Sequence, residues 1–125
     1  MMSLFLAIAA VLGGLSVAGG AFASHALQEQ LPEKAIGVFN TGIRYQMYHA
    51  LALLVVALLL SNAKSAMPWL TASGWLFFVG ILLFSGSLYL ISLAGIKAFG
   101  PVTPVGGVAL MAGWACLAIA AFRLP

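Results

Sequence analysis

The amino-acid sequence predicts an all-α membrane protein, an antiparallel four-transmembrane-helix bundle with an amphipathic interfacial segment before the second span. Hydrophobic side chains make up 64% of the 125 residues and charged side chains only 6%, whereas a soluble domain is about half apolar and about a quarter charged. Four apolar stretches approach the length of about 20 residues that a helix needs to cross a bilayer. Because the connections between them are short, neighbouring spans should pack antiparallel, in a single transmembrane domain over residues 1–125.

The first span is expected over residues 4–23. A second interpretation is a secretory signal peptide, since the Ala-Phe-Ala sequence at 21–23 has the small-x-small spacing of a cleavage site. However, no Lys or Arg precedes Lys34, and the apolar run is longer than the signal-peptide core of about 7 to 15 residues. Small residues also recur at four-residue spacing, which favours close helix packing. We therefore expect a retained helix that ends at His25.

The second span is expected over residues 46–61, which is short for a membrane crossing. Pro32 favours the first turn of a helix, and Glu33 complements a helix N-terminus, so one helix is expected from Pro32 to Ser61. Its first half has an apolar face suited to the membrane interface, formed by Ile36, Phe39 and Ile43.

The third span is expected over residues 69–93 and the fourth over residues 102–122. Glycines in the spans are interpreted as helix-packing positions, because a missing side chain lets a facing helix approach closely. They are Gly13, Gly14, Gly20, Gly86, Gly106, Gly107 and Gly113. The single cysteine, Cys116, excludes an internal disulfide and any multi-thiolate metal site.

Four spans bring the ends of the first and third and the starts of the second and fourth to one side of the membrane. Polar residues gather there: His25, Arg44, Tyr45, Gln46, Tyr48, His49, Ser85, Ser87, Tyr89 and Thr103. Because each unpaired polar group in hydrocarbon costs several kcal/mol, such residues usually face the bundle interior. We predict that Arg44, Tyr48 and His49 form one hydrogen-bonded network with His25 and the two serines. This polar cluster is also the candidate site for ligand or lipid binding.

Four stretches, in this order, carry a resemblance to a known family: "GAFASHAL", "FNTGIRYQMYHALALL", "GILLFSGSLYLISL" and "TPVGGVALMAGW". Together they resemble domain of unknown function 423, also called uncharacterised protein family 0382, with human transmembrane protein 256 as a relative. The resemblance covers essentially the whole chain, although Ser24 stands where members usually have a smaller residue. It implies a multi-pass, four-helix protein of the bacterial inner (plasma) membrane, and it supplies no reaction and no catalytic residues.

Residue chemistry leaves two classes of function open. The first is a structural or accessory protein that interacts with membrane lipids, and that forms a homo-oligomer or joins a larger membrane complex through its small-residue faces. The second is a small carrier or ligand-binding protein whose polar cluster admits a polar or anionic molecule from one leaflet. A bis-histidine haem protein is a weaker alternative, in which His25 and His49 would lie near the same interface.

An enzyme is not expected, since the sequence has no catalytic triad and no paired buried carboxylates. No cofactor is expected, and no metal site either, because no carboxylate or thiol lies near the histidines. The charges are scattered singly, so no nucleic-acid partner is expected. The side with the polar cluster holds three Lys or Arg residues and the other side two plus the N-terminal amine, a slight bias toward a cytoplasmic polar cluster.

Overall fold

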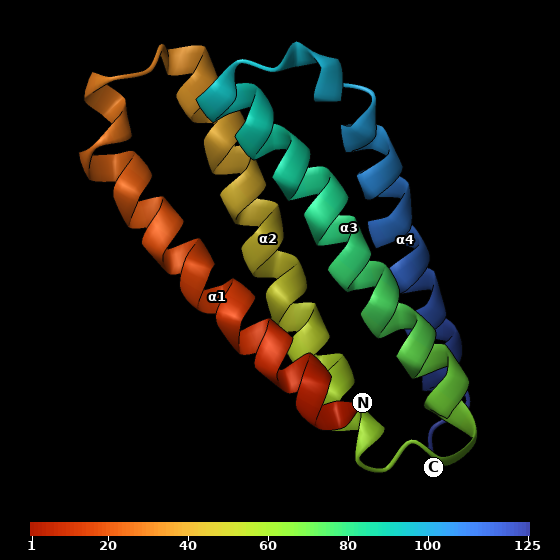
Figure 1. Cartoon of the computed structure of the whole chain (residues 1–125). Helices are drawn as coiled ribbons and strands as arrows, with labels where there is room; N and C mark the ends of the chain where they lie inside the picture. Colours follow the sequence, from red (N-terminus) through yellow and green to blue (C-terminus); the bar gives the residue numbers. More distant parts are fainter.

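Four long α-helices joined by short connections build the protein (Figure 1). The computed structural model describes all residues from Met1 to Pro125. The helices are α1 (Met2–His25), α2 (Glu33–Leu60), α3 (Met67–Ala94) and α4 (Val102–Ala121), with one short 3-10 turn in each connection. All four are long and apolar enough to cross a membrane. The predicted fold class, an antiparallel membrane bundle, is therefore confirmed.

The second helix is longer than the span predicted from hydropathy at 46–61. The predicted interfacial segment is its first half, which continues the axis of the second half without a break (Figure 1). With 28 residues, α2 is about 42 Å long at about 1.5 Å per residue. The hydrocarbon core of a bilayer measures about 30 Å, so the first turns of α2 reach the headgroup region. Hydropathy alone missed the first half of α2 because Asn40, Thr41 and Arg44 make it less apolar.

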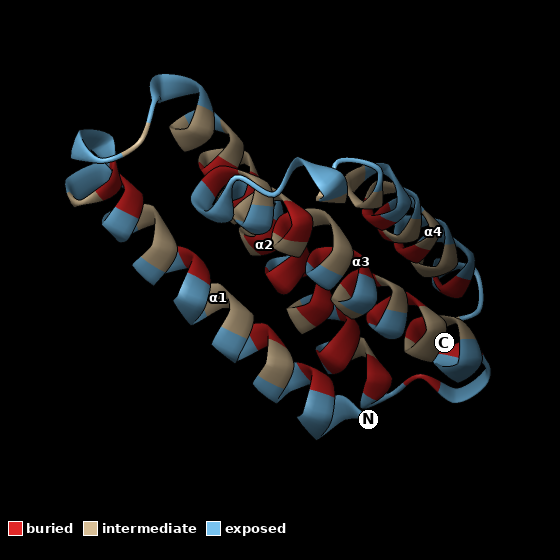
Figure 2. Cartoon of the chain, turned by 45° about the horizontal axis from the view of Figure 1, so that its top comes forward, coloured by how far each residue is buried: buried red, intermediate tan, exposed pale blue.

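The two middle helices form the centre of the bundle, with α1 along α2 and α4 along α3 (Figures 1 and 2). In their most apolar windows, 44% of α2 and 33% of α3 are buried, against 17% of α1 and 22% of α4. The central core contains fully buried side chains from all four helices, among them Phe5, Leu53, Leu70, Phe77 and Ala120. The outward faces of α1 and α4 are apolar and exposed, as expected for surfaces that lipid covers in a membrane.

Glycines bring α3 and α4 into backbone contact. A Cβ atom added to Gly106 would lie 2.3 Å from the backbone nitrogen of Phe84, and one added to Gly113 would lie 2.7 Å from the Phe77 ring. Only glycine fits such distances, so these two positions hold the two helices together. At three glycines that the sequence analysis did not select, a Cβ atom would overlap a side chain of another helix: Tyr89 at Gly42, Phe5 at Gly74 and Leu110 at Gly80.

The remaining glycines expected at helix contacts lie in open positions. Added Cβ atoms on Gly20 and Gly107 would meet their nearest neighbour at 3.8 Å, which is ordinary van der Waals contact. Gly13, Gly14 and Gly86 have no atom within 4 Å of such a Cβ. Gly13 and Gly14 line a pocket of about 320 Å³ between α1 and α2. Small-residue spacing identifies a helix face, but it does not reveal whether that face points toward a neighbour or toward lipid.

Candidate functional site

Gln46 joins three helices at the centre of the bundle. Its side-chain amide nitrogen Nε2 donates a 2.9 Å hydrogen bond to the carbonyl oxygen of Leu12 in α1. Its oxygen Oε1 accepts a 2.6 Å hydrogen bond from the hydroxyl of Tyr89 in α3. A glutamine amide has both a donor and an acceptor group. This buried side chain can therefore connect α2 to both of its neighbours at once.

Serines of α3 make further connections between helices. The Ser85 hydroxyl donates to the carbonyl oxygen of Gly42 at 2.6 Å, and the hydroxyls of Ser87 and Thr103 share a hydrogen bond between α3 and α4. In the other half of the bundle, the Ser73 hydroxyl donates to the carbonyl oxygen of Gly113 at 2.8 Å. Every buried side-chain nitrogen or oxygen in the chain has a hydrogen-bond partner. The buried polar residues thus satisfy one another or the backbone.

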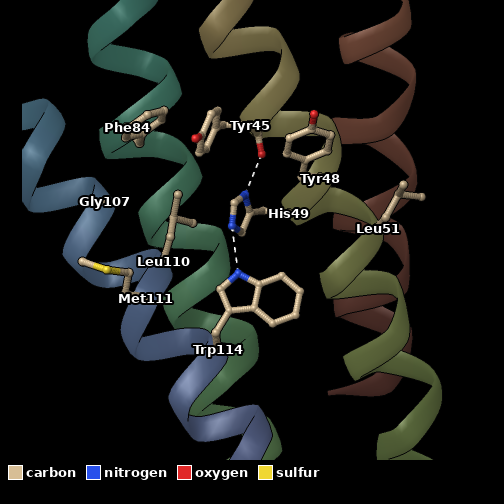
Figure 3. A pocket seen from close by; sticks show the side chains of 9 residues that line it. All are labelled: Tyr45, Tyr48, His49, Leu51, Phe84, Gly107, Leu110, Met111 and Trp114. Carbon is tan, nitrogen blue, oxygen red and sulfur yellow. Dashed lines mark hydrogen bonds between the residues drawn. The ribbon is translucent and has the colours of Figure 1, made fainter.

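His49 is buried, with 6% of its surface exposed, and it lies near the middle of α2. Its Nδ1 atom lies 2.7 Å from the carbonyl oxygen of Tyr45, and its Nε2 atom lies 3.1 Å from the indole nitrogen of Trp114 in α4 (Figure 3). A carbonyl only accepts and an indole N–H only donates. The His49 ring is therefore neutral, with its proton on Nδ1, and both of its nitrogens are engaged within the bundle.

The two histidines do not form a matched pair. His25 is the exposed last residue of α1, where it forms no side-chain hydrogen bond, whereas His49 is buried at mid-helix. The expectation that both lie near one interface is wrong, because His49 lies near the middle of α2 whereas His25 ends α1. A bis-histidine haem does not fit this arrangement. No group of three or more His, Cys, Asp or Glu side chains is placed to hold a metal ion.

The other predicted cluster residues lie on the outer surface of α2. Arg44 is exposed without a hydrogen bond to another residue, and Tyr45 and Tyr48 are 38% and 53% exposed. The predicted single network therefore divides into separate contacts, and neither His25 nor Arg44 takes part in any of them. Successive residues of a helix point about 100° apart, so of two residues close together in the sequence one can face the core and the other the lipid.

A groove between α2 and α4 opens beside His49, with α3 at its back (Figure 3). Its volume is about 640 Å³. The Tyr45 and Phe84 rings pack with their centroids 4.8 Å apart, and the Trp114 ring packs against the Phe77 ring with centroids 5.1 Å apart. The nine residues that line the groove are Tyr45, Tyr48, His49, Leu51, Phe84, Gly107, Leu110, Met111 and Trp114. The lining is thus mainly aromatic and aliphatic, and it carries no formal charge while His49 is neutral.

Trp114 is a site residue that the sequence analysis did not select. Tryptophan prefers the two membrane interfaces, where its indole N–H finds polar partners. Trp114 instead lies well inside the fourth apolar stretch, so its N–H needs a partner within the bundle. The position of Trp114 in the middle of an apolar stretch could have identified it as a site residue. The structure shows that His49 is the hydrogen-bond partner of its indole N–H.

Comparison with known proteins relates this chain to bacterial membrane proteins. The family described as "Protein of unknown function (DUF423)" matches residues 19–107. The UPF0382 membrane protein YwdK of Bacillus subtilis is 43% identical over 122 residues, with 98% of both chains covered. A UPF0382 membrane protein of Haemophilus influenzae is 42% identical over 124 residues, which cover 98% of this chain and 97% of the relative. No solved structure matches the chain.

Proposed function

The chain belongs to the DUF423 family, and from this premise we propose that it is a lipid-interacting accessory protein of the bacterial inner membrane, without enzymatic activity. Its groove between α2 and α4 binds the hydrocarbon chain of a membrane lipid. The observation that carries the proposal is the groove itself, about 640 Å³ of mainly apolar space that opens on the side of the bundle. Ligand sites are typically concave, apolar and of this volume.

The lining of the groove fits a lipid chain with a polar end. Leu51, Leu110 and Met111 offer flexible apolar contacts. The Tyr45 and Tyr48 hydroxyls form no hydrogen bond within the chain, and Figure 3 shows them in the upper part of the groove. Arg44 lies on the surface of α2 one turn before Tyr48, toward the same end of the helix. An arginine there can extend its charged end to the headgroups.

Internal hydrogen bonding supports an accessory protein over a carrier of polar solutes. A carrier site needs polar groups that are free to bind its substrate. Here Gln46, Ser85, Ser87 and Tyr89 bind one another, neighbouring hydroxyls or backbone carbonyls, and His49 uses both ring nitrogens. These groups hold the helices in place, and a polar metabolite would have to displace existing bonds.

The outer helix α1 supports the proposal of a homo-oligomer or a larger membrane complex. Gly13 and Gly14 line an open pocket of about 320 Å³ between α1 and α2, and Val11, Leu15 and Val17 of α1 are exposed. Small residues let helices approach closely within a membrane, where packing and not water exclusion drives association. The bacterial inner membrane is the compartment in which four apolar helical spans are typical.

Native mass spectrometry of the purified protein in a mild detergent tests the groove proposal. The wild-type protein should retain about one phospholipid per chain in this groove. Gly107→Leu should remove most of this retained lipid, because the new side chain extends into the groove, while its Cβ atom meets its nearest neighbour at only 3.8 Å.

Val105→Leu is the matched control. This residue of α4 is 59% exposed and does not line the groove, so the variant should keep the retained lipid. Equal retention in Gly107→Leu and Val105→Leu would contradict binding in the groove. A stoichiometric water-soluble metabolite in place of a lipid would instead support the carrier.

A further inference from the structure

A second pocket lies at one end of the bundle, between the first turns of α2 and the end of α3. It is separate from the groove and encloses about 270 Å³. It differs from the groove in its charge, because two cationic side chains line it. The eight lining residues are Pro32, Lys34, Ala35, Val38, Ile91, Ser92, Gly95 and Lys97.

The turn after α3 brings one of these lysines to the pocket. Gly95 ends α3 in the left-handed conformation, with φ 68° and ψ 20°, and its N–H binds the carbonyl oxygen of Ile91. The N–H of Ile96 binds the carbonyl oxygen of Leu90, and the chain reverses after this left-handed C-terminal cap. This reversal brings Lys97 to the same pocket as Lys34 of α2. The two cations therefore come from different elements, and both residues are exposed.

No carboxylate neutralises these lysines. The chain has two acidic side chains, Glu29 and Glu33, and neither forms an ion pair with Lys34 or Lys97. The backbone N–H groups in the first turn of α2, which also lines the pocket, have no side-chain cap. The lining of the pocket therefore carries two positive charges and no acidic side chain.

The depth of the pocket places it among lipid headgroups. It is formed where α2 begins and α3 ends, and each of these helices has 28 residues. A helix of about 42 Å extends beyond a hydrocarbon core of about 30 Å, so its end turns lie at headgroup level. The lipid phosphate is the anion present at that depth.

We propose that this pocket binds the phosphate of an anionic phospholipid, with Lys34 and Lys97 as the two cationic contacts. Basic pockets between transmembrane helices recognise anionic headgroups in this manner. The apolar side chains of Val38 and Ile91 would contact the upper part of the lipid. This site is independent of the groove between α2 and α4, and it gives the protein a preference for anionic lipid.

The test is competition between two lipids for the purified full-length protein, measured by native mass spectrometry. Micelles contain phosphatidylglycerol and phosphatidylcholine in equal amounts, with identical acyl chains. Wild-type protein should retain more phosphatidylglycerol than phosphatidylcholine. The double variant Lys34→Gln/Lys97→Gln should lower this ratio about tenfold or more, since each basic residue near an anionic surface contributes about fivefold.

The double variant Lys64→Gln/Arg123→Gln is the matched control, since it removes two cations from the opposite end of the bundle, outside both the pocket and the groove. It should leave the preference close to the wild-type value. An unchanged preference in Lys34→Gln/Lys97→Gln, or an equal loss in Lys64→Gln/Arg123→Gln, would overturn the proposal. Competition by millimolar inorganic phosphate would assign the pocket to a free anion instead of a lipid. Gly107→Leu separates the two sites, because it should reduce total retained lipid without abolishing the preference for phosphatidylglycerol.

Discussion

The two outer helices, α1 and α4, are attached to the bundle in different ways. Helix α4 packs its backbone against α3 at Gly106, where a Cβ atom would lie 2.3 Å from a backbone atom. Helix α1 is attached through side chains: the Phe5 ring fills the space beside Gly74, and Gln46 binds the Leu12 carbonyl oxygen. A backbone contact cannot adjust to a larger side chain, whereas a side-chain contact can.

Glycine therefore has opposite roles in the two helices. In α4 it permits a contact that no other residue allows, whereas in α1 the pair Gly13 and Gly14 lines an open pocket beside α2. The sequences around them look alike, with adjacent glycines in an apolar span. Only the position of the neighbouring helix distinguishes them, and substitutions in the two helices should show the difference directly.

The largest effect is expected for Gly106→Ala. Its added methyl group would overlap the backbone of Phe84, and α3 and α4 would have to separate. Overpacking of this kind costs about 1 to 3 kcal/mol, and contact with backbone places this variant at the upper end. The free energy of unfolding in detergent, measured by circular dichroism, gives the loss. The adjacent variant Gly107→Ala is the control, since its Cβ atom meets only a ring carbon at 3.8 Å. Equal losses in both variants would contradict a tight contact at Gly106.

A smaller effect is expected at the polar connection of α1. Gln46→Leu removes the bond to Leu12 and leaves the Tyr89 hydroxyl without its partner. The expected loss is about 1 to 2 kcal/mol, as found for hydrogen bonds between membrane helices and for stranded polar groups. The Leu12 carbonyl still accepts a 2.8 Å bond from Ser16, so most of the cost arises at Tyr89.

A double-mutant cycle isolates this connection. In a Tyr89→Phe background no hydroxyl is left unpaired, so Gln46→Leu should destabilise the protein less than it does in the wild type. Strictly additive losses would show that the two side chains do not interact. The cycle uses the same unfolding measurement as the glycine variants, which makes the two attachments directly comparable.

Hydropathy was sufficient to predict the fold, because four long apolar stretches in a short chain allow few other arrangements. It was not sufficient for the polar residues. Arg44 and Gln46 are two positions apart, yet one faces outward and the other joins three helices. In α1, α3 and α4 nearly every face is apolar, so the pattern does not reveal which side meets a neighbour. The residues that line the groove follow from which helix faces meet, and for this reason the sequence analysis identified only some of them.

The smallest effect is expected for Gly13→Ala on α1. Nothing lies within 4 Å of the added methyl group, and alanine favours a helix over glycine by up to about 1 kcal/mol. The unfolding free energy should therefore stay the same or rise slightly. Gly19→Ala on the same helix should cost a little, because its methyl group would displace the flexible end of Ile43.

The same variant tests whether the open face of α1 contacts a second chain. If two copies pack through Gly13 and Gly14, the methyl group keeps their backbones apart, and Gly13→Ala should shift the protein toward monomer in cross-linking at equal detergent-to-protein ratio. The unfolding free energy of the monomer would still not fall, which separates this result from a folding defect. An unchanged oligomer distribution in Gly13→Ala and in Gly13→Ile would show that lipid alone covers this face. In that case the contrast between the outer helices concerns only their attachment within one chain.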